Sequence, residues 1–364
     1  MSTGPDADLT RETACNLRDL IADGSVSPVE VLDAHLDAIE RRNPALNAIV
    51  TLDADAARDT AKTAEAQVQA EEPIGPLHGL PIVIKDVTPT AGMRTTYGCP
   101  VYADNVPTED VTVVARLRAA GAIILGKSNT PEFATGANTV NEVFGATRNP
   151  WNMDLSPAGS SGGSAAAVAS GMVPLAHGTD FGGSLRVPAA FCGIVGLRTT
   201  PGLIPNHPMP LPFDPGQVHG PLARTAEDAA LMIDGMAGFS PMSPISVAPP
   251  WPSCLAEIRT HENPAGLRIA YAPEIAGIGI DPEIAETCEA AVDALRQSGA
   301  TVEEISLDQQ FKDILTRIQE FRTLSAALTA DVRRLQKNVA REVRESNRKN
   351  RKRRVQSGDT KRPP

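Results

Sequence analysis

The sequence has few aromatic residues, no clustered cysteines and no apolar run long enough to cross a membrane. Aromatic residues make up only 4% of the 364 residues, so small side chains must fill much of the core. No run reaches the roughly 18–20 apolar residues that span a bilayer. The N-terminal stretch MSTGPDADLTRETA lacks the basic flank and apolar segment of a signal peptide. The sequence therefore predicts a cytoplasmic protein with no membrane partner.

The cysteines argue against a disulfide framework and against a zinc site. They are odd in number and widely scattered, without a CxxC pair or a nearby group of histidines. We expect buried free thiols, since a free cysteine packs like a small hydrophobic residue. No metal site is predicted. The five positions are Cys15, Cys99, Cys192, Cys254 and Cys288.

The net charge of −10 conceals two segments of opposite sign. Residues 333–364 hold 13 Lys/Arg and 3 Asp/Glu, a net of +10. The remainder holds 34 − 13 = 21 basic and 44 − 3 = 41 acidic residues, a net of −20. An acidic body of this kind repels nucleic acid. We therefore expect no nucleic-acid partner, unless the basic tail is a genuine part of the protein.

Buried strands alternate with helices along most of the chain. The stretches PIVIKD (81–86) and AIILGK (122–127) are short apolar runs typical of buried strands. A capping box at Ser27 and Glu30 begins one helix, and residues 53–70 and 110–120 predict two more. Residues 266–306 predict a β-α-β unit. This alternation indicates an α/β fold with helices on both faces of the sheet.

The Gly/Ser run GSSGGS (159–164) permits several interpretations. A flexible linker is one, although the run leads directly into an Ala-rich helix. A P-loop is excluded because no lysine follows the glycines. Gly159, Ser161 and Gly163 also match the G-x-S-x-G nucleophile elbow. That elbow needs an acid and a histidine downstream, and the candidates are Asp180 or Asp214 with His207 or His219.

A second glycine pair lies in TDFGGSLRVP (179–188). Gly182 and Gly183 can adopt backbone angles that are closed to other residues. Consecutive N–H groups can then point at one spot ahead of the helix expected near Ser184, which would form an anion site. In acyl transfer such a site is an oxyanion hole. Taken alone, however, GGS is more typical of a tight turn with a capping serine.

Lys85 ends an apolar strand, where a lysine is unusual. An ordinary lysine has a pKa near ~10.4, so about one in a few thousand is neutral at pH 7. Burial lowers that pKa by several units, which makes a buried lysine a credible general base. For a lone lysine the commoner arrangement is a side chain that reaches water at the end of the strand.

Together these stretches resemble the amidase signature family. The family pattern has a lysine in V-K-D, then G-G-S-S-G-G-S-A, then G-T-D-x-G-G-S-I-R-x-P-A-x-x-C-G. This sequence reads VIKD, AGSSGGSA and GTDFGGSLRVPAAFCG, with 75 residues from Lys85 to Ser160 and 24 more to Ser184. The likeness extends to about residue 306. It implies a large central mixed β-sheet flanked by helices on both faces.

The resemblance also implies roles for individual residues. Ser184 would be the nucleophile that forms an acyl-enzyme, Ser160 the bridging serine and Lys85 the base, with no cofactor. The implied oxyanion hole consists of the N–H groups of Phe181, Gly182, Gly183 and Ser184. Supporting positions and pocket positions complete the implied site: Ser161, Asp180 and Arg186 as supports, Ala134 and Gly136 in the substrate pocket.

The sequence departs from the family pattern in two places. Ala158 replaces the first glycine of G-G-S-S, a substitution that causes strain if φ is positive there. The second departure is the C-terminus. We therefore assign residues 1–332 to a C-terminally incomplete amidase signature domain and residues 333–364 to a basic tail. The tail has too few apolar residues to fold alone. A disordered tail and a basic binding patch are alternatives to the hypothesis we favour, a shifted reading frame or truncated gene.

These observations favour hydrolysis of a small-molecule carboxylic amide to an acid plus ammonia or an amine. One alternative is the A-type subunit of a tRNA-dependent amidotransferase, a branch of the same family that depends on partner subunits. TPEF (130–133) replaces the M-D-E-F usual in that branch, which favours a stand-alone amidase. Another alternative is a truncated, non-catalytic remnant. A homodimer is left open.

Overall fold

The computed structural model describes residues 8–261, 263–274, 277, 279–307, 313 and 316–317. The chain forms two units, the first of which ends at His261. Each unit is described by itself. The boundary predicted between residues 332 and 333 and the tail 333–364 lie outside the described residues.

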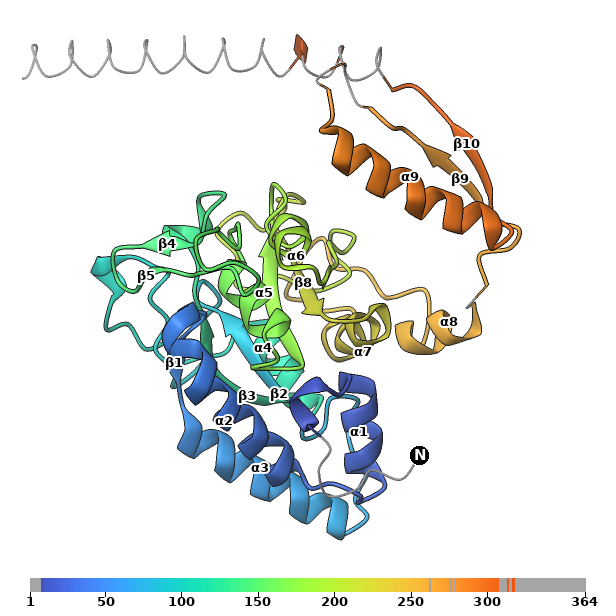
Figure 1. The fold of residues 1–364 in the computed structure, drawn as a ribbon. Helices are drawn as coiled ribbons and strands as arrows, with labels where there is room; N and C mark the ends of the chain where they lie inside the picture. Colours follow the sequence, from blue (N-terminus) through green and yellow to red (C-terminus); the bar gives the residue numbers. More distant parts are fainter. Residues whose placement is uncertain are drawn as a thin grey trace, which may run out of the picture. The chain divides into compact units, whose positions relative to one another are not determined.

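The first unit is built on a six-stranded mixed sheet (Figure 1). The strand order is β1-β3-β2-β6-β8-β7. The neighbours β3, β2 and β6 are parallel, while β1 and β8 run antiparallel to the strands beside them. This arrangement confirms the predicted mixed sheet. The strands are β1 (Ile49–Leu52), β2 (Pro81–Lys85), β3 (Ile123–Ser128), β6 (Leu175–Asp180), β7 (Val195–Gly196) and β8 (Val218–Ala223).

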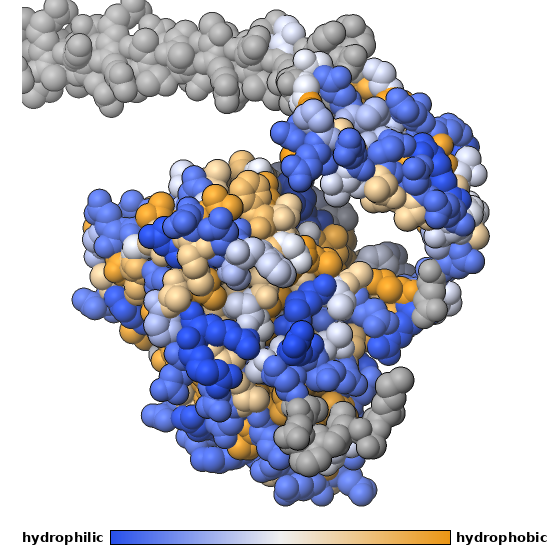
Figure 2. Space-filling model, viewed as in Figure 1, coloured by the Kyte–Doolittle hydropathy of each residue, from blue (hydrophilic) through white to orange (hydrophobic). Residues whose placement is uncertain are grey.

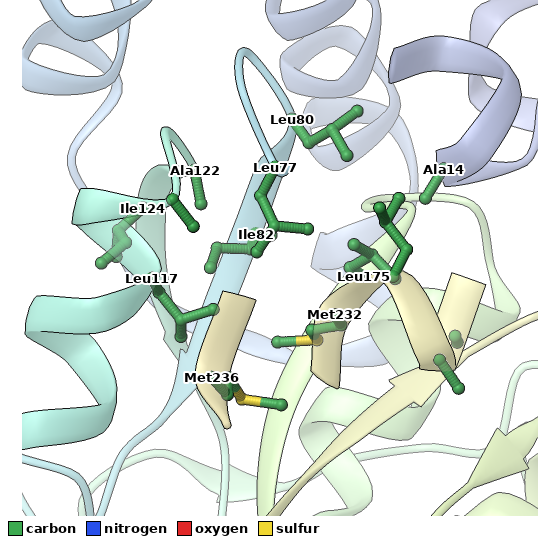
Figure 3. Packing of buried hydrophobic residues seen from close by; sticks show 14 of the residues in the cluster. Ala14, Leu77, Leu80, Ile82, Leu117, Ala122, Ile124, Leu175, Met232 and Met236 are labelled. Atoms are coloured by element: carbon green, nitrogen blue, oxygen red, sulfur yellow. The ribbon is translucent and has the colours of Figure 1, made fainter. Parts of the chain in front are cut away.

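Helices cover both faces of this sheet, as the sequence predicts. In β2, Ile82 and Ile84 belong to a hydrophobic cluster with α1, α4 and α7, part of which is shown in Figure 3. Val83 points the other way, into a cluster with α2, α3, α5 and α6. The alternation follows from the two-residue side-chain period of a strand. The helices of the first unit are α1 (Ala14–Ala22), α2 (Pro28–Leu46), α3 (Ala54–Gln69), α4 (Thr112–Ala119), α5 (Gly162–Ala169), α6 (Arg186–Cys192), α7 (Ala226–Met236) and α8 (Cys254–Thr260).

Local sequence explains several of these elements. Ser27 and Glu30 form the predicted capping box at the start of α2. Helix α5 is buried along almost its whole length, because its run of alanines lets it lie close against the sheet. On the face seen in Figure 2, hydrophilic residues cover the outer side of α2 and α3, and hydrophobic residues gather over α5 and α6. Short elements join the rest: η1 (Leu9–Arg11), η2 (Pro100–Tyr102), η3 (Glu132–Ala134), β4 (Val140–Asn141) and β5 (Gly145–Ala146).

A β-bulge between β2 and β3 decides where two lysines point. Ile82 pairs with Ile124, but Val83 pairs with Gly126, so Leu125 is an extra residue on β3. The bulge shifts every later side chain of β3 to the opposite face. Lys127 consequently lies opposite Ile84, and Ser128 lies opposite Lys85. The two lysines therefore leave the sheet on different faces.

The second unit contains the predicted β-α-β arrangement. Strands β9 (Arg268–Tyr271) and β10 (Thr301–Glu304) pair in parallel, and α9 (Pro282–Gln297) connects them. Pro282 occupies the first turn of α9, and Asp281 caps the helix. No helix in the described parts of the chain has both the length and the apolar character needed to cross a membrane.

Candidate active site

Lys85 stands at the point where three segments of the first unit meet. Its side chain is fully buried. The Nζ atom lies 2.7 Å from Ser160 Oγ, 2.9 Å from Ser161 Oγ and 2.9 Å from Thr179 Oγ1. These partners come from the loop before α5 and from the end of β6. The arrangement excludes the simpler interpretation of a lysine that reaches water at the end of a strand.

Burial lowers the pKa of Lys85 from 10.5 to about 7, although the negative charge of Asp180 works in the opposite direction. An ammonium ion loses solvation in this dry setting, while the neutral amine loses little. The neutral form of Lys85 is then far more abundant at pH 7 than that of an ordinary lysine. A neutral amine has a lone pair that can accept a proton from a hydroxyl group.

The loop that carries the two serines has an unusual backbone. Ala158 adopts φ 59°, in the left-handed region, and the Gly159–Ser160 peptide bond is cis. Thr139 Oγ1 donates a hydrogen bond of 2.8 Å to the carbonyl oxygen of Ala158. Ala158 thus has a positive φ, which strains a residue with a Cβ atom.

Ser161 connects this loop to the segment that carries Ser184. Its backbone N–H donates to the Ser184 carbonyl oxygen at 3.2 Å. Its Oγ lies between Lys85 Nζ and the backbone of Thr179, to whose carbonyl oxygen it donates at 3.2 Å. Ser161 is therefore a structural link between the lysine, β6 and the Gly-Gly turn.

Asp180 holds the Gly-Gly turn in place. Its carboxylate accepts hydrogen bonds from the N–H groups of Gly183 at 2.9 Å and Leu185 at 3.1 Å. It also forms ion pairs with Arg186 at 3.0 Å and Arg198 at 3.1 Å. Burial acts to raise the pKa of Asp180, but hydrogen bonds from Arg186 and the backbone outweigh it and lower the pKa to about 2. Asp180 is therefore a permanent anion at neutral pH.

The contact from Gly183 bears on the predicted oxyanion hole. Since its N–H already donates to Asp180, Gly183 has no free donor for an oxyanion in this conformation. The N–H groups of Phe181, Gly182 and Ser184 donate to no other group in the part of the chain that the structure describes. Three of the four predicted donors are thus available.

A cavity of about 460 Å³ joins most of the predicted site residues. Ser184 is partly exposed, and its Oγ has no hydrogen-bond partner among the described residues. Lys85 lies behind the cavity wall and reaches it through Ser160. Seven of the predicted residues line this cavity: Ala134, Gly136, Ser160, Phe181, Gly182, Gly183 and Ser184.

The nucleophile-elbow interpretation does not fit the structure. Ser161 Oγ contacts Lys85 and Thr179 and bonds to no histidine in the described chain. His219 is paired instead with His177 at 2.9 Å and with Asn206 at 3.0 Å. Asp180 is committed to its arginines. A serine–histidine–acid relay is therefore not assembled around Ser161.

The sequence patterns did not predict that Thr179 and Arg198 belong to this neighbourhood, nor that Lys127 is buried on the opposite face of the sheet. Thr179 lies within the GTD part of the family motif, but the motif does not predict its contact with Lys85. Arg198 carried no signal in the sequence. Lys127 carried the same signal as Lys85, a lysine that ends an apolar strand, and it is fully buried with its pKa lowered by burial to about 7. Within the described ranges, no group of three His, Cys, Asp or Glu side chains could hold a metal ion.

Comparisons with known proteins show which family the chain resembles. The chain is 44% identical over 300 residues to the glutamyl-tRNA(Gln) amidotransferase A-subunit of Acidothermus cellulolyticus, a match that covers 82% of this chain and 59% of that protein. It is 41% identical over 285 residues to an acylamidase from Rhodococcus erythropolis, a match that covers 78% of this chain and 59% of that protein. The chain thus spans about three fifths of the length of these relatives.

Solved structures show the same similarity. A bacterial aryl acylamidase of the amidase signature family matches with a TM-score of 0.76 and 31% identity, over 86% of this chain and 66% of that one. A 6-aminohexanoate cyclic dimer hydrolase matches with a TM-score of 0.76 and 33% identity, over 83% of this chain and 62% of that one. The family model named Amidase matches residues 30–360. The chain therefore belongs to the amidase family, the amidase signature enzymes.

Proposed function

We propose that this chain carries the machinery of an amidase that hydrolyses a carboxylic amide through an acyl-enzyme. Ser184 is the nucleophile, Ser160 the bridging serine and Lys85 the general base. The observation that carries this proposal is the 2.7 Å contact between Lys85 Nζ and Ser160 Oγ at a fully buried lysine. A lysine without solvent, hydrogen-bonded to a hydroxyl at the edge of a cavity, is suited to proton transfer.

The reaction proceeds in two halves. Ser184 Oγ attacks the amide carbonyl, and its proton passes to Ser160, whose own proton passes to Lys85. The tetrahedral intermediate then collapses, the C–N bond breaks, and the amine leaves with the proton returned from Lys85. Water attacks the acyl-enzyme by the same proton path, which releases the acid and restores Ser184.

The negative charge on the carbonyl oxygen requires donors. We assign this role to the N–H groups of Phe181, Gly182 and Ser184, because Gly183 N–H serves Asp180. Asp180 and Arg186 support the turn, and Ser161 supports the lysine. Thr179 joins these supports as the third hydrogen-bond partner of Lys85 Nζ.

A fluorophosphonate probe with mass mapping of the labelled peptide tests the assignment. We expect the label on Ser184, no label in Ser184→Ala, and at least about 100-fold slower labelling in Lys85→Met, since a general base contributes 10²–10⁴. His207→Ala is the control and should label normally. Labelling of Ser161, or persistent labelling of the Ser184→Ala variant, would overturn the proposal. A cooperatively folded wild-type chain that takes no label would support the non-catalytic remnant.

A second candidate function is that of the A-type subunit of a tRNA-dependent amidotransferase. The 44% identity to such a subunit favours it. The two candidates differ in their need for partners. Hydrolysis of simple amides by the purified chain alone supports the stand-alone amidase, whereas labelling of Ser184 without turnover of any simple amide supports the amidotransferase role.

A further inference from the structure

A second, larger cavity adjoins the one that contains Ser184. Its volume is about 690 Å³, within the ~300–1,000 Å³ typical of small-molecule sites. Phe133, Ala134 and Gln217 line both cavities, so the two cavities lie next to each other.

The lining of the second cavity is mostly apolar. Segment 87–89 and Val111 form part of it, and the loop 206–217 before β8 supplies Met209, Leu211 and two prolines. Among its lining residues, all of which lie in the described first unit, Asp214 is the single acidic side chain, and there is no lysine or arginine. The cavity therefore offers no cation to pair with a negatively charged group.

Two polar residues of this lining, Asn206 and His219, are hydrogen-bonded to each other, and His219 is also bonded to His177. Asn206 Oδ1 can only accept, so His219 Nε2 carries the hydrogen of their 3.0 Å bond. His219 Nδ1 must then accept from His177 Nε2–H, at 2.9 Å. Burial lowers the pKa of His219 to about 4, with a further contribution from Lys85, and burial likewise lowers the pKa of His177. Both rings are therefore neutral at pH 7 and have no N–H to spare for an anion.

The wall formed by residues 87–89 is supported from behind. Lys127 Nζ donates to the Thr88 carbonyl oxygen and, at 2.9 Å, to Thr90 Oγ1. Burial lowers the pKa of Lys127 to about 7, and Asp86 opposes this shift. Lys127 is absent from the cavity lining and fully buried, so its amine cannot contact a bound molecule.

We propose that the second cavity binds an uncharged apolar part of the amide substrate, an aryl or alkyl group beyond the reacting carbonyl, and that it discriminates against a carboxylate there. The proposal rests on the proposed function, because it assigns a specificity to the same active site. Its physical basis is that the lining offers a buried carboxylate no cation, so the cost of desolvating that charge is not offset by an ion pair. Phe133, Met209 and Leu211 are its specificity-determining residues.

Matched substrates test the discrimination. Phenylacetamide and its para-carboxylate analogue place the ring on the acyl side, while acetanilide and 4-acetamidobenzoate place it on the amine side. We expect kcat/KM to favour the neutral member by about tenfold or more on the side that occupies the cavity. Equal kcat/KM within both pairs would overturn the proposal.

A charge placed in the cavity should change this preference. Met209→Lys supplies the missing cation, so the ratio of neutral to carboxylate substrate should fall by about tenfold or more. Comparison of the two substrates within each variant cancels any change in overall activity. Met242→Lys is the matched control, because Met242 is 60% exposed and absent from both cavities. An unchanged ratio in Met209→Lys would contradict the proposal.

Binding without turnover separates this proposal from the proposed function. In Ser184→Ala, calorimetry should detect phenylacetamide or acetanilide and not its carboxylate analogue. Adding Met209→Trp, or Leu211→Trp at the exposed rim, should fill the cavity and abolish this binding. Two variants are used so that a folding defect in one of them does not decide the result. Binding that survives both substitutions overturns the cavity assignment. A third outcome separates the two proposals: both substitutions abolish binding, but the wild-type protein hydrolyses no amide. In that case the cavity assignment stands and only the proposed function is overturned.

Discussion

Lys85 Nζ lies 2.7 Å from Ser160 Oγ and 2.9 Å from Ser161 Oγ, so one amine contacts two consecutive serines. The two hydroxyls differ in what lies beyond them. Ser160 lines the cavity that contains Ser184, whereas Ser161 donates to the Thr179 carbonyl oxygen inside the protein. The same lysine can therefore exchange protons toward the cavity through Ser160 and be held in place through Ser161.

Thr179→Val should lower kcat/KM by about tenfold, because it removes one of three partners that orient Lys85 Nζ. Thr179→Ser should restore activity, since it keeps the hydroxyl. Thr95→Val is a matched control: Thr95 is also buried, and its hydroxyl bonds only to the nearby Met93 carbonyl oxygen. Steady-state kinetics on a simple amide provides the measurement. Equal losses in Thr179→Val and Thr95→Val would indicate a general packing effect.

Activity should rise with pH through about pH 7, where the buried Lys85 loses its proton. The base must be neutral to accept a proton, so kcat/KM should fall about tenfold per pH unit below that value and level off above it. A pH–rate profile of kcat/KM from pH 3 to 9 measures this. A limb near pH 4 would instead point to His219, whose pKa burial lowers to about 4.

Stability should also depend on the buried lysines. Burial lowers the pKa of Lys127 from 10.5 to about 7, so above pH 7 the unfolded chain binds more protons than the folded one. The free energy of unfolding should therefore gain up to about 1.4 kcal/mol per pH unit from this lysine between pH 7 and 8.5. Urea denaturation should show a shallower rise in Lys127→Met, while the exposed control Lys62→Met keeps the wild-type slope.

Ala158→Gly should stabilise the protein. Ala158 is buried and has φ 59°, a conformation that costs an L-residue about 1–2 kcal/mol and a glycine little. After the entropy that glycine adds to the unfolded chain, a net gain of about 1 kcal/mol remains. Ala166→Gly, in the buried helix α5, is the opposite control and should destabilise. Thermal or urea unfolding measures both changes in stability. A lower melting temperature in Ala158→Gly would contradict the idea that Ala158 is strained in the folded protein.

Much of the fold and the centre of the site follow from local sequence. Apolar runs bounded by glycine and proline specify β2 and β3, and Ser27 with Glu30 fixes the start of α2. The family motifs predict Lys85, Ser160 and Ser184 as the reacting residues, and the structure places Lys85 and Ser160 in contact. These features depend on side-chain periodicity, capping and motif spacing, all of which can be read within short windows of sequence.

Other features were decided only by tertiary structure. The bulge at Leu125 is a matter of strand register. It places Lys127 on the face opposite Lys85, although Lys85 ends β2 and Lys127 lies one residue before the end of β3. The bond from Gly183 N–H to Asp180 withdraws one predicted oxyanion donor. The second cavity joins residues 87–89 to residues 206–219, more than a hundred positions apart. Local patterns specify which elements form, but register, hydrogen-bond partners and cavities depend on how distant elements pack, which no short window of sequence contains.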